Sequence, residues 1–448
     1  MNGKLKRLTP VQLIVILYFT AILISTILLS LPIAHRPGVQ LHFLDALFTA
    51  SSAVSVTGLT VVNTAETFSP VGITFLLVIL HFGGIGFMTL GTFLWLATGQ
   101  RIGIQRRQMI MVDQNQTDLS GLVRLMKNIL FLSLLIEAVG ALVLGLYYYW
   151  VYGYSTADAL LFGVFSSVSA FTNAGFDIFG NSLFRFSGDY FVQSVTILLL
   201  IAGGIGFPVL VEAKEWLFAS DRRRFRFSLF TKVTVTTYFL LLAFGVITLW
   251  LLESDRFHAG MSWHQTFFYT LFNSVTTRNG GLATMDLNEY SLPSQLVICF
   301  LMFTGASPSS VGGGIRTTTL AVVILTVISY ARGQNHVRLF RREFLDTDVK
   351  KAAIVFVTAV MLVSLSTILL AVEQPGAPFN QVLFEVCSAF GTTGLSLGIT
   401  PDLTQPGKWT ILTLMFVGRI GILSLLFLMR NPTSPDVYRY PRERVIIG

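Results

Sequence analysis

The chain has 448 residues, of which 53% are hydrophobic and only 12% are charged. Soluble domains carry about 25% charged residues, so this composition excludes an ordinary soluble protein and indicates a chain that crosses a lipid membrane several times. The formal net charge of +8 does not point to nucleic acid as a partner, because the basic residues are spread over short connections between apolar segments.

Long apolar segments occur along the whole chain. The first, Val11–Leu31, follows a basic start and has no small-residue cleavage site after it, so we expect a retained spanning helix and not a signal peptide. We expect four outer and four inner helices, each near or above the length of about 20 residues that crosses a bilayer. The outer helices are Val11–Leu31, Ile129–Val151, Val233–Leu252 and Ala352–Val372, and the inner helices are Val71–Thr98, Phe191–Phe218, Leu292–Tyr330 and Trp409–Met429.

A shorter segment lies between each outer helix and the next inner helix. Each offers about 10 helical residues, too few to span a bilayer, and each ends in a small, polar cluster with a glycine before an apolar residue. These glycines are Gly58, Gly175, Gly281 and Gly394, at intervals of 117, 106 and 113 residues. The repetition predicts an all-α polytopic membrane protein with eight transmembrane helices, in which four parallel helix–pore-loop–helix repeats surround a central pseudo-fourfold pore. We place the repeats at 1–100, 101–220, 221–345 and 346–448.

Basic residues gather in every second connection. They cluster at the N-terminus, around 101–127, 214–232 and 332–351, and in the C-terminal tail, whereas the alternate connections hold few. This pattern places both termini in the cytoplasm. Two of the basic connections, 101–118 and 219–229, are candidate docking surfaces for a cytosolic partner, although topological anchoring also explains their charge.

The four glycine clusters predict a cation-selectivity filter. The C-terminal ends of the short helices point toward the membrane centre, where their partial negative charge favours cations. Glycine reaches backbone conformations that turn carbonyl oxygens toward an axis, and four such loops form rings of oxygens that can replace the water shell of a monovalent cation. The predicted filter residues are Val56, Thr57, Gly58, Asn173, Ala174, Gly175, Asn279, Gly280, Gly281, Thr392, Thr393 and Gly394.

The motifs SVTGL, FTNAGF, TTRNGG and FGTTG on one chain resemble the Trk/Ktr/HKT superfamily of potassium transporters, most closely the membrane subunit of a bacterial Ktr-type system. The resemblance covers essentially the whole chain and includes Arg278 in the third motif. It implies potassium uptake, with the transported ion held at the filter carbonyls. It also implies that glycine at position 58 favours potassium, because family members with serine there tend to pass sodium. The motif is shorter than TVGYG, so we expect weaker selectivity than in a dedicated potassium channel.

The same resemblance implies the location and the partners of the chain. A homodimer in the bacterial plasma membrane would bind a cytosolic ring of nucleotide-binding regulatory subunits, with sodium as the activator. No cofactor is expected on this chain. Cys299 and Cys387 lie in apolar segments and indicate neither a disulfide framework nor a metal site.

The third inner segment, Leu292–Tyr330, would be about 58 Å long as one straight helix, nearly twice the hydrocarbon thickness. Its middle reads GASPSSVGGGIR, and non-helical backbone at membrane depth is tolerated only when it is buried in protein or lines a water-filled path. We therefore expect two half-helices joined by an intramembrane loop that gates the pore, with a passive kink as the alternative. The predicted gate residues are Ser309, Ser310, Gly312, Gly313, Gly314 and, in the last inner helix, Arg419.

Three charged or titratable side chains lie inside the predicted helices. Arg419 occupies the place of a glycine in the first two repeats; it acts either as an electrostatic barrier below the filter or as an ion-pair partner, for example of Glu137. His81 is interpreted as an interhelical histidine, and Glu385 as a carboxyl group bonded behind the filter. The GGIGF clusters are interpreted as close-packing glycines.

Other functions have less support from the sequence. No HExxH motif, Walker A motif or Ser/His/Asp order is present, so an enzyme is not expected. An alternating-access secondary cation carrier would have inverted halves, which the regular charge pattern opposes. An unregulated monovalent cation channel remains an alternative, because a regulator would be a separate chain. For the tail end, Val445–Gly448, a frayed terminus is expected by default, and contact with the dimer partner is the alternative.

Overall fold

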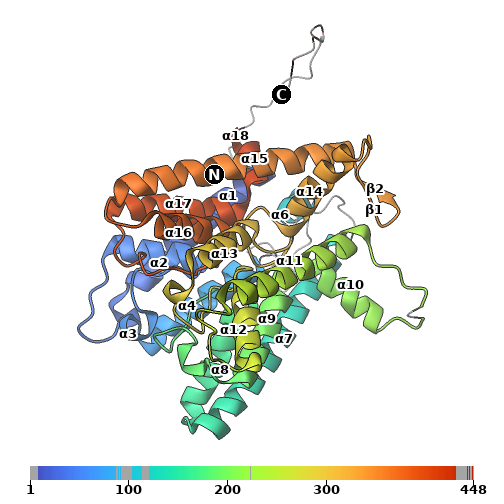
Figure 1. Cartoon of the computed structure of the whole chain (residues 1–448). Helices are drawn as coiled ribbons and strands as arrows, with labels where there is room; N and C mark the ends of the chain where they lie inside the picture. Colours follow the sequence, from blue (N-terminus) through green and yellow to red (C-terminus); the bar gives the residue numbers. More distant parts are fainter. Residues whose placement is uncertain are drawn as a thin grey trace.

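The computed structural model describes residues 9–86, 89, 91, 103–113, 121–221 and 223–429, together with 441, 443 and 446. Secondary structure in these ranges is almost entirely helical (Figure 1), and the strands described there, β1 (Arg338–Leu339) and β2 (Arg342–Glu343), form one antiparallel hairpin. Most of 87–98 in the first predicted inner helix and most of the C-terminal tail lie outside the described residues, as does most of the predicted dimer contact at 445–448.

The four predicted outer helices are confirmed as apolar helices long enough to cross a membrane. They are α1 (Pro10–Ser30), α7 (Leu122–Tyr152), α11 (Leu229–Glu253) and α15 (Asp346–Glu373). α1 begins with a capping box, in which Thr9 and Gln12 satisfy each other's free backbone N–H groups. The outward faces of these helices expose large apolar side chains such as Ile27, Leu142 and Ile247, which suits contact with lipid.

The four short segments form helices that do not reach across a membrane. They are α2 (Phe43–Ser55), α8 (Thr156–Phe171), α12 (Trp263–Thr276) and α16 (Phe379–Gly391), of 13, 16, 14 and 13 residues. Each packs against the outer helix that precedes it. We refer to α2, α8, α12 and α16 as the short helices.

The inner segments are not straight helices. They are α4 (Pro70–Ile85), α9 (Tyr190–Gly204) with α10 (Phe207–Leu217), α13 (Leu292–Thr304) with α14 (Thr317–Ala331), and α17 (Gln405–Ile420) with α18 (Ile422–Met429). The break predicted in the third segment is confirmed. The prediction of continuous helices in the second and fourth segments is wrong, because α9–α10 bends by 105° and α17–α18 by 96°.

Glycines with left-handed backbone angles explain these bends. Gly206 (φ 105°) and Gly421 (φ 87°) adopt a conformation that ends an α-helix and that only glycine reaches without strain. The glycine-rich motifs therefore break the helices as well as pack them. Among the described residues, four single helices are long enough to span, or up to six spans if each bent pair is one, so eight spans remain a prediction.

The inner and short helices pack in a cycle. α4 packs against α8, α9 against α12, and α13 against α16, so each inner helix contacts the short helix of the next unit. α17 of the last unit packs against α2 of the first, and Figure 1 shows these red and blue segments side by side. The fourth unit therefore packs against the first, which closes the cycle of contacts.

The remaining helices lie at the edges of this arrangement. α3 (Thr64–Thr67) follows the first glycine cluster, and α6 (Ile104–Asp113) packs against α1 and α7. Buried apolar side chains form two clusters, one centred on the first two units and the other on the third and fourth. The unit boundaries given above remain predictions.

Candidate functional site

The four glycines of the repeated clusters come together in a closed ring. A Cβ atom built on Gly58 would lie 2.9 Å from Gly175 Cα, and one built on Gly175 would lie 2.9 Å from Gly281 Cα. The corresponding distance from Gly281 to Gly394 Cα is 3.4 Å, and from Gly394 to Gly58 Cα it is 2.9 Å. A residue larger than glycine has no room at these positions, so the ring brings four distant parts of the chain into backbone contact.

The backbone of each cluster has the same pattern of angles. All four ring glycines have positive φ, between 68° and 97°. The residue two positions earlier also has positive φ in every unit: Val56 (56°), Asn173 (53°), Asn279 (72°) and Thr392 (52°). Asparagine tolerates a left-handed conformation, but a β-branched valine or threonine rarely adopts one. Strained backbone of this kind persists where the surrounding structure fixes it, and it concentrates at functional sites.

Hydrogen bonds to the short helices occupy the N–H groups of these segments. In three units the residue before the ring glycine donates its amide to a serine carbonyl in the short helix. These bonds are Thr57 to Ser52, Ala174 to Ser169 and Thr393 to Ser388, each 2.8 Å long. In the third unit Gly280 donates to the Thr276 carbonyl at 2.7 Å.

One carbonyl group in each of the four segments lacks a hydrogen-bond donor among the described residues. Among the described residues, no hydrogen bond reaches the carbonyl oxygen of Thr57, Ala174, Gly280 or Thr393. The Ala174 oxygen lies 2.7 Å from where a Cβ of Gly58 would be, against the neighbouring unit. Buried carbonyl oxygens normally have a partner, so this group of oxygens is suited to a cation.

A polar cavity adjoins one side of the ring. Its volume is about 190 Å³, and all four ring glycines line it together with Asp177, Asp286 and Ser396. Asp177 lies in the connection between α8 and α9, outside the spanning segments. Burial raises the pKa of its carboxyl group, and hydrogen bonds from the backbone of Gly180 and Phe179 act in the opposite direction. The sequence had not identified Asp177 or Asp286.

The loop between α13 and α14 lies against the segments that lead into the ring. Gly312 packs against the Asn279 side chain, and a Cβ on Gly313 would lie 2.7 Å from Thr392 Oγ1. The loop is also bonded to the second inner segment, because Phe207 donates its amide to the Ser309 carbonyl at 2.8 Å. The structure thus places the predicted loop beside the residues two positions before the third and fourth ring glycines.

Side chains tie this loop down. Arg419, only 8% exposed, donates to the carbonyl oxygens of Val311 in the loop and Gly83 in α4. Arg316 donates to the carbonyls of Gly312 and Ser307. Ser310 Oγ donates to the Ser307 carbonyl at 2.6 Å, and Gly314 packs against the Gly305 backbone.

The suggested ion pair of Arg419 with Glu137 is not formed. Glu137 instead pairs with His81 at 3.1 Å, which confirms His81 as an interhelical contact. The prediction that Glu385 is bonded behind the glycine segment is also confirmed, because its buried carboxylate accepts from Ser396 Oγ at 2.8 Å and from Thr400. Arg419 has backbone carbonyls as partners, so its charge is not neutralised by a described acidic side chain.

Two contacts near the ring were not predicted from the sequence, although the residues belong to the third glycine motif. The Asn279 amide donates to the backbone of Gly391 and Thr392 in the next unit, the latter at 3.0 Å. Arg278 is fully buried, with its guanidinium 5.4 Å from the Tyr238 ring centre. Its guanidinium nitrogens have no hydrogen-bond partner among the described residues. The sequence motif singles out both residues but does not indicate these contacts.

Comparison with known proteins assigns the chain to a family. The family model described as "TrkH: Cation transport protein" matches residues 11–436. The "Ktr system potassium uptake protein D" of Bacillus subtilis (strain 168) is 54% identical, covering 100% of this chain and 99% of the relative. The "Ktr system potassium uptake protein B" of the same organism is 36% identical, over 99% of this chain and 98% of the relative.

Two further comparisons agree. The "Potassium/sodium uptake protein NtpJ" of Enterococcus hirae is 34% identical over 99% of this chain and 98% of the relative. The solved structure of "the Potassium Transporter TrkH from Vibrio parahaemolyticus" matches with a TM-score of 0.71 at 18% identity, covering 94% of this chain and 85% of that one, which supports the fold. The chain therefore belongs to the TrkH/Ktr family of membrane cation transport proteins, which are not enzymes.

Proposed function

We propose that this chain is the pore-forming membrane subunit of a bacterial potassium uptake system. The observation that carries the proposal is the closed ring of Gly58, Gly175, Gly281 and Gly394. Carbonyl oxygens beside this ring accept no hydrogen bond from a described residue. The ring would act as a selectivity filter with one glycine per repeat, because such oxygens can replace the hydration shell of a potassium ion. The potassium named in the relatives' descriptions supports this choice of ion.

The loop between α13 and α14 is the proposed gate. It packs against Asn279 and Thr392 just before the ring, so it would obstruct the path of an ion that leaves the filter. Arg419 adds a positive charge at the same place and bonds to the loop carbonyl of Val311. Both features oppose cation passage until the loop moves.

The wider assembly is part of the same proposal. Eight spans place both termini in the cytoplasm, and the chain forms a homodimer on a cytosolic ring of nucleotide-binding regulatory subunits. Sodium activates uptake; the name of the Enterococcus hirae relative, which includes sodium, supports a role for that ion. An unregulated cation channel is the competing function.

Growth rescue tests the potassium assignment. A potassium-uptake-deficient bacterial strain that expresses this chain with a candidate ring protein should grow at low potassium, and growth should improve with added sodium. Expression of the chain alone distinguishes a regulated system from an unregulated channel. No rescue under any of these conditions, with the protein present in the membrane, would reject the proposed function.

A further inference from the structure

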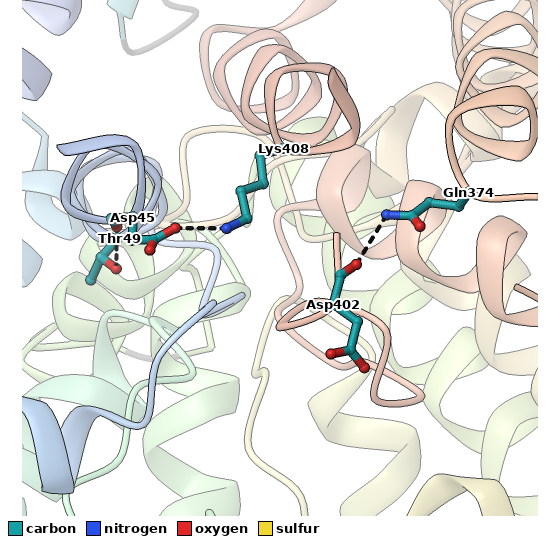
Figure 2. A network of polar contacts seen from close by, with 5 residues as sticks. All are labelled: Asp45, Thr49, Gln374, Asp402 and Lys408. Carbon is teal, nitrogen blue, oxygen red and sulfur yellow. Dashed lines mark hydrogen bonds and ion pairs between the residues drawn. The ribbon is translucent and has the colours of Figure 1, made fainter. Parts of the chain in front are cut away.

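The cycle of helices closes where the last unit meets the first, and an ion pair lies at that point. Lys408 Nζ in the first turns of α17 is 2.7 Å from Asp45 Oδ1 in α2, and the two side chains are only 15% and 17% exposed (Figure 2). The two residues are 363 positions apart. Both lie at the ends of their helices that are remote from the glycine ring.

Two other junctions between units are joined near the starts of their helices by hydrogen bonds and not by an ion pair. Lys408 is the fourth residue after the helix N-cap Thr404, and in the third unit Gln295 has the same position after Ser291. Gln295 Oε1 accepts from Asn380 Nδ2, at the start of α16, at 2.8 Å. The second and third units are joined by Tyr190 OH and His264 Nδ1 at 2.6 Å. Of these described contacts, the one that closes the cycle is the charged one.

The position of Lys408 requires a partner. A cation near the N-terminus of a helix is disfavoured by the positive end of the helix dipole, whereas an acidic residue in the first turn is favoured. Asp45 lies in the first turn of α2 and has this favourable arrangement, and Lys408 lacks it. Because both groups are mostly removed from water, loss of one partner leaves the other poorly compensated.

Both partners are held on rigid elements. Gln374 Nε2, at the end of α15, donates to the Asp402 carbonyl at 3.3 Å just before α17, and Figure 2 shows this bond beside the ion pair. The Asp45 carbonyl accepts from Thr49 Oγ1 at 2.8 Å. α2 then runs to its C-cap Val56, two residues before Gly58, so the position of α2 determines where the first glycine segment lies.

We propose that Asp45 and Lys408 form a positioning pair that closes the four-unit cycle and sets ion selectivity. The inference rests on the proposed filter function of the glycine ring. Among the described residues, no other ion pair or hydrogen bond joins α2 to the fourth unit, so without the pair the first glycine segment can shift relative to Gly394. A small displacement of one quarter of the ring changes the spacing of the carbonyl oxygens and so the preference for potassium over sodium.

Flux measurements test this role. Full-length protein in proteoliposomes is assayed for potassium and sodium flux, as wild type and as Asp45→Asn and Lys408→Met. We expect the potassium-to-sodium flux ratio to fall about tenfold in each variant, which corresponds to about 1.4 kcal/mol. The ratio does not depend on how much protein folds, so a purely structural role would lower both fluxes and leave it unchanged. Lys408→Gln serves if Lys408→Met cannot be purified.

A double variant and a control sharpen the result. Asp45→Asn combined with Lys408→Gln recreates the Asn380–Gln295 chemistry of the neighbouring junction and should restore the ratio. Asp348→Asn removes an exposed pair with Lys351 and should leave the ratio as in wild type. If wild type is selective and the single variants have the same flux ratio, the inference is overturned but the proposed function is not. The same holds if the flux ratio of the double variant is no higher than that of the single variants. A wild type without potassium flux would overturn the proposed function, and the inference with it.

Discussion

Gly58 is the residue at which the absence of a side chain matters most directly. Its φ is 97°, and a Cβ atom added there would lie 2.7 Å from the Ala174 carbonyl oxygen. Alanine therefore cannot occupy this position without strain. We expect Gly58→Ala to lower potassium uptake at least about tenfold, because a loss of about 1.4 kcal/mol in ion stabilisation suffices. The measurement is initial-rate rubidium or potassium uptake. Gly188→Ala, in open space at ordinary φ, is the control and should behave as wild type; equal uptake by both variants would contradict the filter.

The Asp177 carboxyl group lines the cavity beside the ring and predicts a pH dependence of ion entry. Burial raises the pKa of this carboxyl group, so it takes up a proton at a higher pH than an ordinary aspartate. As the pH falls through that raised pKa, the negative charge is lost and attraction of cations into the cavity weakens. We expect the KM for potassium to rise on mild acidification in wild type.

Asp177→Asn should have a high KM already at neutral pH and a flatter pH profile. The comparison is made at low ionic strength, where screening is least. Asp255→Asn, at an exposed residue that does not line the cavity, is the matched control. A wild-type pH profile in Asp177→Asn would show that another group is responsible.

At the scale of elements, Arg419 connects three inner segments. It joins α17 to the loop carbonyl of Val311 and to Gly83 in α4, and its charge is costly in the membrane interior. Arg419→Ala removes this charge and both bonds, so under the proposed gating role we expect a higher cation flux that depends less on the regulator. Arg419→Lys keeps the charge without the planar fork and should fall between. Flux in proteoliposomes is the readout, with exposed Arg332→Ala as the control; unchanged or lower flux in Arg419→Ala would reject gating by this residue.

The same elements show what the sequence can and cannot predict. The length of the apolar segments was enough to predict the four outer helices. A glycine that recurs at similar intervals was enough to predict the four segments that the structure brings together. The bends at Gly206 and Gly421 were missed, because glycine before an apolar residue reads equally well as close packing. An ion pair with Glu137 was one of two interpretations of Arg419 from the sequence, but Glu137 pairs with His81. The Asp45–Lys408 pair was out of reach, since no local pattern relates residues 363 positions apart.

At the scale of the whole molecule, cyclic packing makes the four units interdependent. Each short helix that leads into the ring is wedged against an inner helix of another unit, so a movement in one unit changes the contacts of its neighbour. The loop between α13 and α14 contacts the second inner segment through Phe207 and the fourth through Arg419. A partner that moves α10 or α14 can therefore act on the proposed gate without touching the ring.

The basic surface between α10 and α11 is the expected docking point for such a partner. Arg223, Arg224 and Arg226 are exposed there, and Arg224 has only Asp221 as its described ion-pair partner. Charge-based docking weakens with salt, because the screening length falls from about 10 Å at 0.1 M to about 3 Å at 1 M. We expect affinity-purified chain to run as a homodimer and to retain a soluble nucleotide-binding oligomer at low salt, with release of that oligomer at high salt.

Charge reversal at this surface tests the docking directly. Arg223→Glu with Arg226→Glu should lower retention of the oligomer at low salt while the chain remains dimeric, measured by native mass and by the ratio of the two proteins after purification. Lys351→Glu, at an exposed lysine of α15, separates a specific surface from a general loss of positive charge. Equal retention by all variants would place the regulatory contact elsewhere, and a chain that never retains an oligomer would favour the unregulated channel.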